Sequence, residues 1–144
     1  MKYINKRLTL EKVNFQKIAK KFGTPFYCYS YSKLKENVNK FKKNFKSFSP
    51  LICFAVKSNT NVNLIREIKK FGLGADVVSL GELMIALKAG IKPNKIVFSG
   101  VGKTSSELNF AISITRVGII HTVYKNFPIV LDLCVKLLRN VLIS

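Results

Sequence analysis

Apolar residues recur along the chain at spacings that predict helices alternating with short strands. Three segments carry apolar residues three and four positions apart, the spacing of a one-sided helix. They are residues 14–22, 32–48 and 63–71. Two more helices are expected over 80–89, with Leu83, Met84 and Leu87 inward, and over 104–112, with Ser105 or Ser106 as the N-cap.

Strands are expected between these helices. Residues 75–78 and 95–98 are short β-branched runs, and residues 8–13 and 26–29 show weaker strand patterns. The alternation predicts an α/β fold with a parallel sheet. Periodicity alone does not separate a doubly wound sheet from a barrel.

The longest uninterrupted apolar run comes just before a lysine. Residues 51–56 are all apolar, and Lys57, Ser58 and Asn59 follow. Such a run predicts a strand buried on both faces, which places Lys57 at its carboxyl end. Active sites of parallel α/β folds form at that edge, and a lysine amine is the group that bonds to an aldehyde cofactor. A structural lysine that caps a strand is the alternative, and the pattern alone leaves it open.

Charge and cysteine content narrow the function classes. The 144 residues include 25 Lys and Arg against 7 Asp and Glu, a net charge of +18, which raises nucleic acid or an anionic membrane as partners. The lysines are spread along predicted helices, which favours solvated helix faces, and a non-catalytic basic binding protein stays the alternative. Cys28, Cys53 and Cys134 show no paired spacing and are expected to be free, buried thiols. We expect a cytoplasmic protein, because no signal-peptide pattern or membrane-spanning apolar stretch is seen.

Four ordered segments resemble the barrel-type amino-acid decarboxylases that depend on pyridoxal phosphate. They are Gly23-Thr24-Pro25-Phe26-Tyr27-Cys28-Tyr29, Phe54-Ala55-Val56-Lys57-Ser58-Asn59, the segment 74–83, and Ile96-Val97-Phe98-Ser99-Gly100-Val101-Gly102-Lys103-Thr104. The resemblance runs roughly from residue 3 to residue 112. It implies the amino-terminal strands and helices of a TIM-type (β/α)8 barrel. Residues 1–30 would be an entry segment that packs with a later β-domain, 31–112 the first βα units, and 113–144 a tail that does not match.

The resemblance also implies site residues and a reaction. Lys57 would hold pyridoxal 5'-phosphate covalently, Asp76 would line the cofactor, and Glu82, Ser79 and Lys103 would support the site. The segments are most similar to the branch that converts meso-diaminopimelate to L-lysine, with the ornithine and arginine branches as the alternative. A small-molecule amino-acid substrate, a homodimer, and neither nucleic acid nor membrane as partner are expected.

The segment after residue 112 is expected to differ from the family. His121 does not stand in the family's histidine motif, so no role is carried to it, and Gly100-Val101-Gly102-Lys103 lacks the spacing of a P-loop. The family's glycine-rich phosphate loop and its acidic partner of the pyridine nitrogen are not recognised. These observations predict a truncated or frame-shifted chain that is inactive alone.

Overall fold

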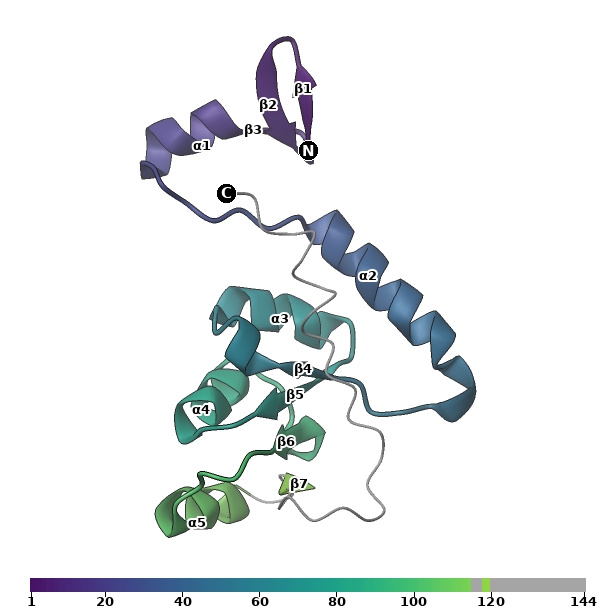
Figure 1. The fold of residues 1–144 in the computed structure, drawn as a ribbon, viewed down its shortest axis with the longest axis vertical. Coiled ribbons are helices and arrows are strands. Elements are labelled where there is room, and N and C mark those ends of the chain that lie inside the picture. The colour runs from purple at the N-terminus through teal and green to yellow at the C-terminus, as the bar shows by residue number, and fades with distance from the viewer. Residues whose placement is uncertain (115–117, 120–144) are drawn as a thin grey trace. The chain divides into compact units, whose positions relative to one another are not determined.

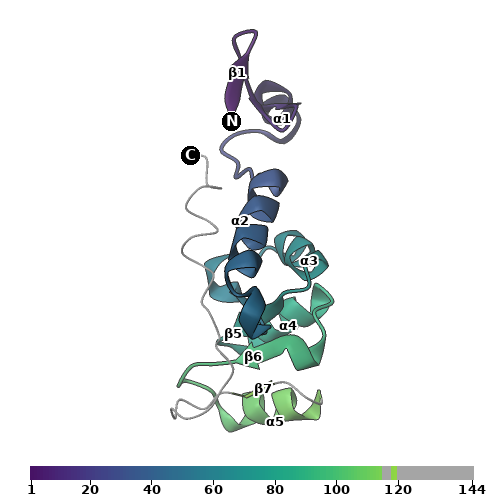
Figure 2. The ribbon, with the colours of Figure 1, turned by 90° about the vertical axis from the view of Figure 1, so that its right-hand side faces the viewer.

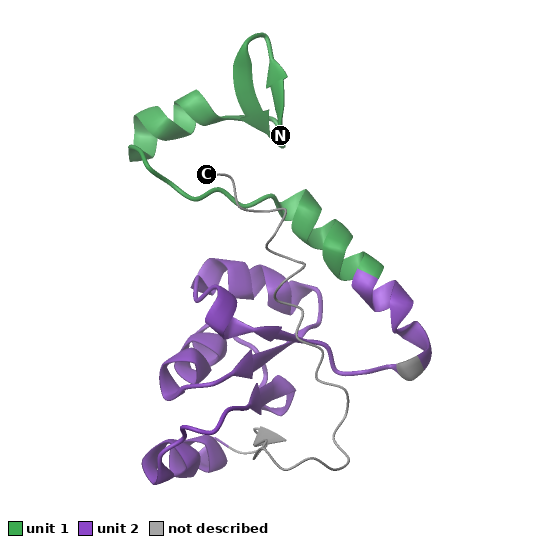
Figure 3. Ribbon diagram, viewed as in Figure 1, with its two compact units in different colours: residues 1–40, 136–144 green, residues 41–135 purple. Residues whose placement is uncertain are grey.

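The computed structural model describes residues 1–114 and 118–119 (Figure 1). The chain forms two compact units, and the boundary between them falls between residues 40 and 41 (Figure 3). His121, Cys134 and most of the tail predicted from residue 113 lie outside the described residues.

The first unit begins with a small antiparallel sheet in the order β1 (Lys2–Ile4), β2 (Arg7–Leu10), β3 (Val13–Asn14). The single strand predicted over 8–13 is wrong. Glu11 and Lys12 adopt φ values of 50° and 72°, so the chain turns there and the strand becomes two. Helix α1 (Phe15–Phe22) follows as predicted. The Asn14 side chain accepts a hydrogen bond from the N–H of Gln16 at its start, and Gly23, with φ 81°, ends it.

The strand predicted over 26–29 is also wrong. Those residues form no strand, because no neighbouring strand pairs with them. The Phe26 ring instead stacks on Phe15 of α1, with ring centroids 6.0 Å apart. Phe26, one of the apolar residues on which the strand prediction rested, therefore packs against a helix instead of belonging to a sheet.

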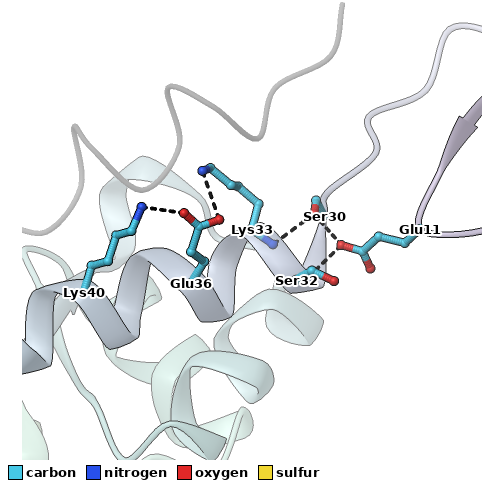
Figure 4. A network of polar contacts seen from close by, with 6 residues as sticks. All are labelled: Glu11, Ser30, Ser32, Lys33, Glu36 and Lys40. Carbon is cyan, nitrogen blue, oxygen red and sulfur yellow. Dashed lines mark hydrogen bonds and ion pairs between the residues drawn. The ribbon is translucent and has the colours of Figure 1, made fainter. Parts of the chain in front are cut away.

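Helix α2 (Tyr31–Asn44) confirms the helix predicted over residues 32–48 and buries Leu34 and Val38. A polar network fixes its first turn (Figure 4). The Glu11 carboxylate accepts hydrogen bonds from the Ser30 hydroxyl and from the N–H of Ser32, and Ser30 Oγ accepts from the N–H of Lys33. The turn between β2 and β3 thus caps the helix, since an anion is favourable at a helix N-terminus.

We expect Glu11→Gln to destabilise the protein modestly at pH 7, by less than about 1 kcal/mol because the site is exposed. The hydrogen bond from Ser30 and that from Ser32 lower the pKa of Glu11. A lowered carboxyl pKa contributes stability above the unfolded-state pKa, and that contribution is lost as pH falls through the folded-state value. The thermal midpoint of the variant should therefore be lower than that of the wild type at pH 7. Near pH 3 the two midpoints should be the same. Glu36→Gln is the control: it removes exposed ion pairs to Lys33 and Lys40, and its effect should fade with salt instead.

The second unit carries a parallel sheet in the order β4 (Cys53–Ala55), β5 (Gly74–Val77), β6 (Ile96–Phe98), β7 (Gly118–Ile119). Helices α3 (Val62–Lys70), α4 (Leu80–Lys88) and α5 (Ser105–Ser113) connect the strands. Helix α4 packs on β5 and β6 and contacts α3 and α5. Figure 2 shows α3 and α4 on one side of β5 and β6.

Each strand of this sheet pairs with the next one in sequence, with no reversal of order. A doubly wound sheet reverses its strand order near the middle, whereas a barrel adds strands one after another. The expected α/β fold with the first strands of a barrel is confirmed. The sequence pattern identified three of these strands, and β7 is a fourth.

Burial in the parallel sheet follows the predicted pattern, whereas α4 departs from it, since Leu87, predicted to point inward, is only half-buried. All three residues of β4 and all three of β6 are buried, and the core is completed by α3 and α4. Leu83 is fully buried as expected, but Met84 is 50% exposed and lines an open apolar groove with Phe110 and Ile114. The buried neighbour of Leu83 is Ala86, three residues on, so the inward face is rotated away from Met84.

Candidate active site

Lys57 lies at the carboxyl edge of the parallel sheet. Strand β4 ends at Ala55, and a 3₁₀ turn over Val56–Ser58 carries Lys57 out of the sheet. Val56 is fully buried and Lys57 is exposed, so the chain passes from core to surface within one residue. Ser58 Oγ donates to the Ala55 carbonyl at 2.8 Å and holds the turn closed. The apolar run before Lys57 therefore positions its amine at this edge.

Asp76 lies on the neighbouring strand at the same edge. In the parallel register Asp76 pairs with Ala55 of β4 on one side and Val97 of β6 on the other. Its Oδ1 accepts a hydrogen bond from Ser99 Oγ at 2.6 Å. The fold therefore brings Lys57 and Asp76, predicted from sequence as site residues, to adjacent strand ends.

Ser79 and Glu82 shape the loop between β5 and α4. Ser79 is the N-cap of α4, and its hydroxyl accepts from the N–H of Glu82 at 3.3 Å. The Glu82 carboxylate accepts from the N–H of Val78 at 3.0 Å. Both contacts are the kind that fix a helix start, so these two residues hold the strand end that follows Asp76.

Glu107 is a residue of this region that the sequence reasoning missed. Thr104, not Ser105 or Ser106, is the N-cap of α5, and Glu107 completes a capping box with it. Glu107 also accepts from the N–H of Leu80 at 3.3 Å, which ties the starts of α4 and α5 together. Hydrogen bonds from the N–H and hydroxyl of Thr104, and then from Leu80, lower the pKa of Glu107. The spacing Thr-x-x-Glu before a helix was the available signal.

Lys103 is turned back on its own loop. Its amine donates to the Gly100 carbonyl and lies 5.3 Å from the centroid of the Phe98 ring. Both contacts come from the segment that carries Lys103, so they fix the loop after β6.

Cys53 lies in the core beneath these residues. The side chain is 1% exposed, and burial, with the charge of Asp76 as a second cause, raises the pKa of its thiol to about 12. A thiol that stays protonated is a poor nucleophile. Cys53 is therefore the buried free thiol that the sequence predicted, whereas Cys28 is only half-buried.

The described part of the chain holds neither a membrane-spanning helix nor a cluster of metal ligands. None of its helices combines the length and the apolar character needed to span a bilayer. Over residues 1–114 and 118–119, no cluster of His, Cys, Asp and Glu is arranged to hold a metal ion.

Comparison with known proteins identifies the family. The model of the pyridoxal-dependent decarboxylases, pyridoxal binding domain, matches residues 31–128. A diaminopimelate decarboxylase from Aquifex aeolicus is 45% identical over 112 residues, which are 78% of this chain and 26% of that protein. The crystal structure of diaminopimelate decarboxylase from Helicobacter pylori complexed with L-lysine is 40% identical, with a TM-score of 0.69 over 74% of this chain and 27% of that one.

The match to other decarboxylases is weaker. The crystal structure of ornithine decarboxylase from Entamoeba histolytica is 25% identical, with a TM-score of 0.64 over 73% of this chain and 33% of that one.

The chain spans about a quarter of the length of the curated relatives that it matches. The matched residues include Lys57, Asp76 and the strands that carry them, and the match extends over more than half of the chain. The chain therefore belongs to the family of pyridoxal-dependent decarboxylases, in the part that forms their pyridoxal-binding domain.

Proposed function

We propose that this chain supplies the cofactor lysine and the first strands of a decarboxylase that converts meso-diaminopimelate to L-lysine and carbon dioxide. The observation that carries the proposal is the placement of Lys57. Lys57 follows a fully buried strand at the carboxyl edge of a parallel sheet, beside the strand that bears Asp76. Functional groups of barrel enzymes gather at this edge.

The side chains at this edge suit pyridoxal phosphate. The cofactor needs a primary amine for its aldehyde, and Lys57 is an exposed amine on a short, hydrogen-bonded turn. When bound, pyridoxal phosphate withdraws electrons from the α-carbon of an amino acid, so that the carboxylate can leave. Lys57 would be the attachment point, and Asp76 would be the nearest carboxylate by strand order.

The other residues of the site would act by holding these two in place. The Asp76 carboxylate would favour positive charge at the strand edge and assist proton movement at the lysine amine. Ser79 and Glu82 would keep the loop after Asp76 in one conformation. The Ser79 hydroxyl accepts from the N–H of Glu82, and the Glu82 carboxylate accepts from the N–H of Val78. Lys103 would act indirectly, through the conformation of the loop after β6.

Sequence similarity supports meso-diaminopimelate as the substrate over ornithine or arginine. The chain is 45% identical to a diaminopimelate decarboxylase and 25% identical to a solved ornithine decarboxylase. The homodimer expected from the resemblance stays a prediction, as do the domain boundaries and the cytoplasmic location expected from the sequence pattern.

A chimera tests the proposal. In the Aquifex aeolicus relative, the aligned segment would be replaced by the matching residues of this chain, and carbon dioxide release would be measured with meso-diaminopimelate, ornithine and arginine. We expect release from meso-diaminopimelate only. A Lys88→Ala chimera is the control, since Lys88 is an exposed lysine at the far end of α4. A folded chimera that binds pyridoxal phosphate and decarboxylates none of the three substrates would contradict the proposal.

A further inference from the structure

Ser99, the residue after β6, forms a hydrogen bond with Asp76, the third residue of β5. It follows β6 directly, and its hydroxyl donates to Asp76 Oδ1 on β5 at 2.6 Å. Hydroxyl-to-carboxylate hydrogen bonds of this length are among the stronger polar contacts in proteins. From this contact we propose that Ser99 is a positioning residue that sets the orientation of the Asp76 carboxylate at the carboxyl edge of the sheet. What that orientation serves rests on the proposed function.

The backbone of Ser99 is held independently of its side chain. Its N–H donates to the Val77 carbonyl at 2.9 Å, which extends the ladder between β5 and β6 by one step. Gly100 follows with φ +89°, a conformation that favours glycine, and turns the chain away from the sheet. Ser99 is thus fixed between a paired strand and a turn, so its hydroxyl has a defined starting position.

The register explains why the two side chains meet. Asp76 pairs with Val97, and Ser99 is two residues beyond Val97, so both side chains fall on the same face of the sheet. The hydrogen bond from Ser99 holds Oδ1 of Asp76 toward the residue that follows β6. This contact restrains the rotation of the Asp76 carboxylate. If Asp76 serves a cofactor attached at Lys57, Ser99 decides which way its oxygens point.

Carbon NMR of the aspartate carboxyl carbons tests the contact without any cofactor. Asp76 and Asp132 are the only aspartates in the sequence, so aspartate labelled with ¹³C at the carboxyl carbon gives two signals, and Asp76→Asn assigns them. In Ser99→Ala the charged carboxylate loses a hydrogen-bond donor, so the titration midpoint of Asp76 should rise above its wild-type value. Ser99→Thr keeps the hydroxyl and should restore the wild-type midpoint. Ser113→Ala is the matched control, because its hydroxyl bonds only within α5.

Two results of this titration would overturn the proposal. One is an unchanged Asp76 midpoint in Ser99→Ala, and the other is the same shift in the alanine and threonine variants. Should the alanine variant not fold, Ser99→Cys replaces it: its weak S–H donor predicts an intermediate shift, and a wild-type midpoint would count against the proposal.

A double-mutant cycle tests the positioning role itself. The full chain would be incubated with pyridoxal phosphate and borohydride, and the rate of labelling at Lys57 measured. Ser99→Ala should slow labelling severalfold in the wild-type background and cause no further change in Asp76→Asn. Equal effects in both backgrounds would show that Ser99 does not act through Asp76. Absence of labelling at Lys57 in the wild type would instead refute the proposed function, while the titration would still decide the Ser99 contact.

Discussion

Replacing Lys57 by alanine in the chimera is expected to lower the rate of decarboxylation by about a thousandfold or more. The physical reason is the loss of the only group placed to bond the cofactor aldehyde on the turn after β4. The measurement is carbon dioxide release, together with the absorbance of the bound cofactor. Both signals should be lost together.

Lys57→Arg separates nucleophilicity from charge. Arginine keeps a positive group at the strand end but does not form the covalent bond, so this variant should be as inactive as the alanine variant. Substantial activity in Lys57→Arg, or a covalent cofactor on Lys103 in either variant, would contradict the assignment of Lys57.

Gly74→Ala is expected to destabilise the fold by about 3 kcal/mol or more. Gly74 opens β5, and a Cβ there would fall well inside contact distance of the Lys95 carbonyl oxygen and 2.9 Å from Cys53 Sγ. The carbonyl belongs to the backbone beside β6, and Cys53 lies in the buried β4, so neither neighbour moves without disturbing strand pairing. Urea denaturation measures the loss of free energy of unfolding.

Gly102→Ala is the matched control for this effect. A Cβ at Gly102 would meet no atom within 4 Å, and its backbone is not in the left-handed region. The unfolded chain loses freedom while the folded chain gains no strain, so stability should be unchanged or slightly higher. Equal stability of the two alanine variants would contradict the close approach of β4, β5 and β6 at Gly74.

The sequence predicted the parts of this fold that depend on local pattern. The apolar run of residues 51–56 placed Lys57 at a strand end, and the helical spacing of residues 63–71 matched α3. Met84 was misplaced because α4 is apolar on several sides, so that spacing alone does not choose an inward face. Tertiary packing on β5 and β6 makes that choice.

Contacts between strands could not be predicted in the same way. The bond from Ser99 to Asp76 depends on register, and the bond from Leu80 to Glu107 joins residues 27 positions apart. Neither has a periodic signature. The cap of α5 was different, because the spacing of Thr104 and Glu107 is that of a capping box and is visible in the sequence. Ser105 and Ser106 were predicted as caps because serine is also a common N-cap residue.

Peptide mapping after borohydride reduction tests most directly whether Lys57 is the cofactor lysine. The full chain would be incubated with limiting pyridoxal phosphate, reduced and digested, and the label on each lysine peptide counted by mass spectrometry. We predict that the Lys57 peptide carries most of the label and that exposed lysines such as Lys88 carry little. Label spread evenly over the exposed lysines, or concentrated on a lysine other than Lys57, would contradict the account.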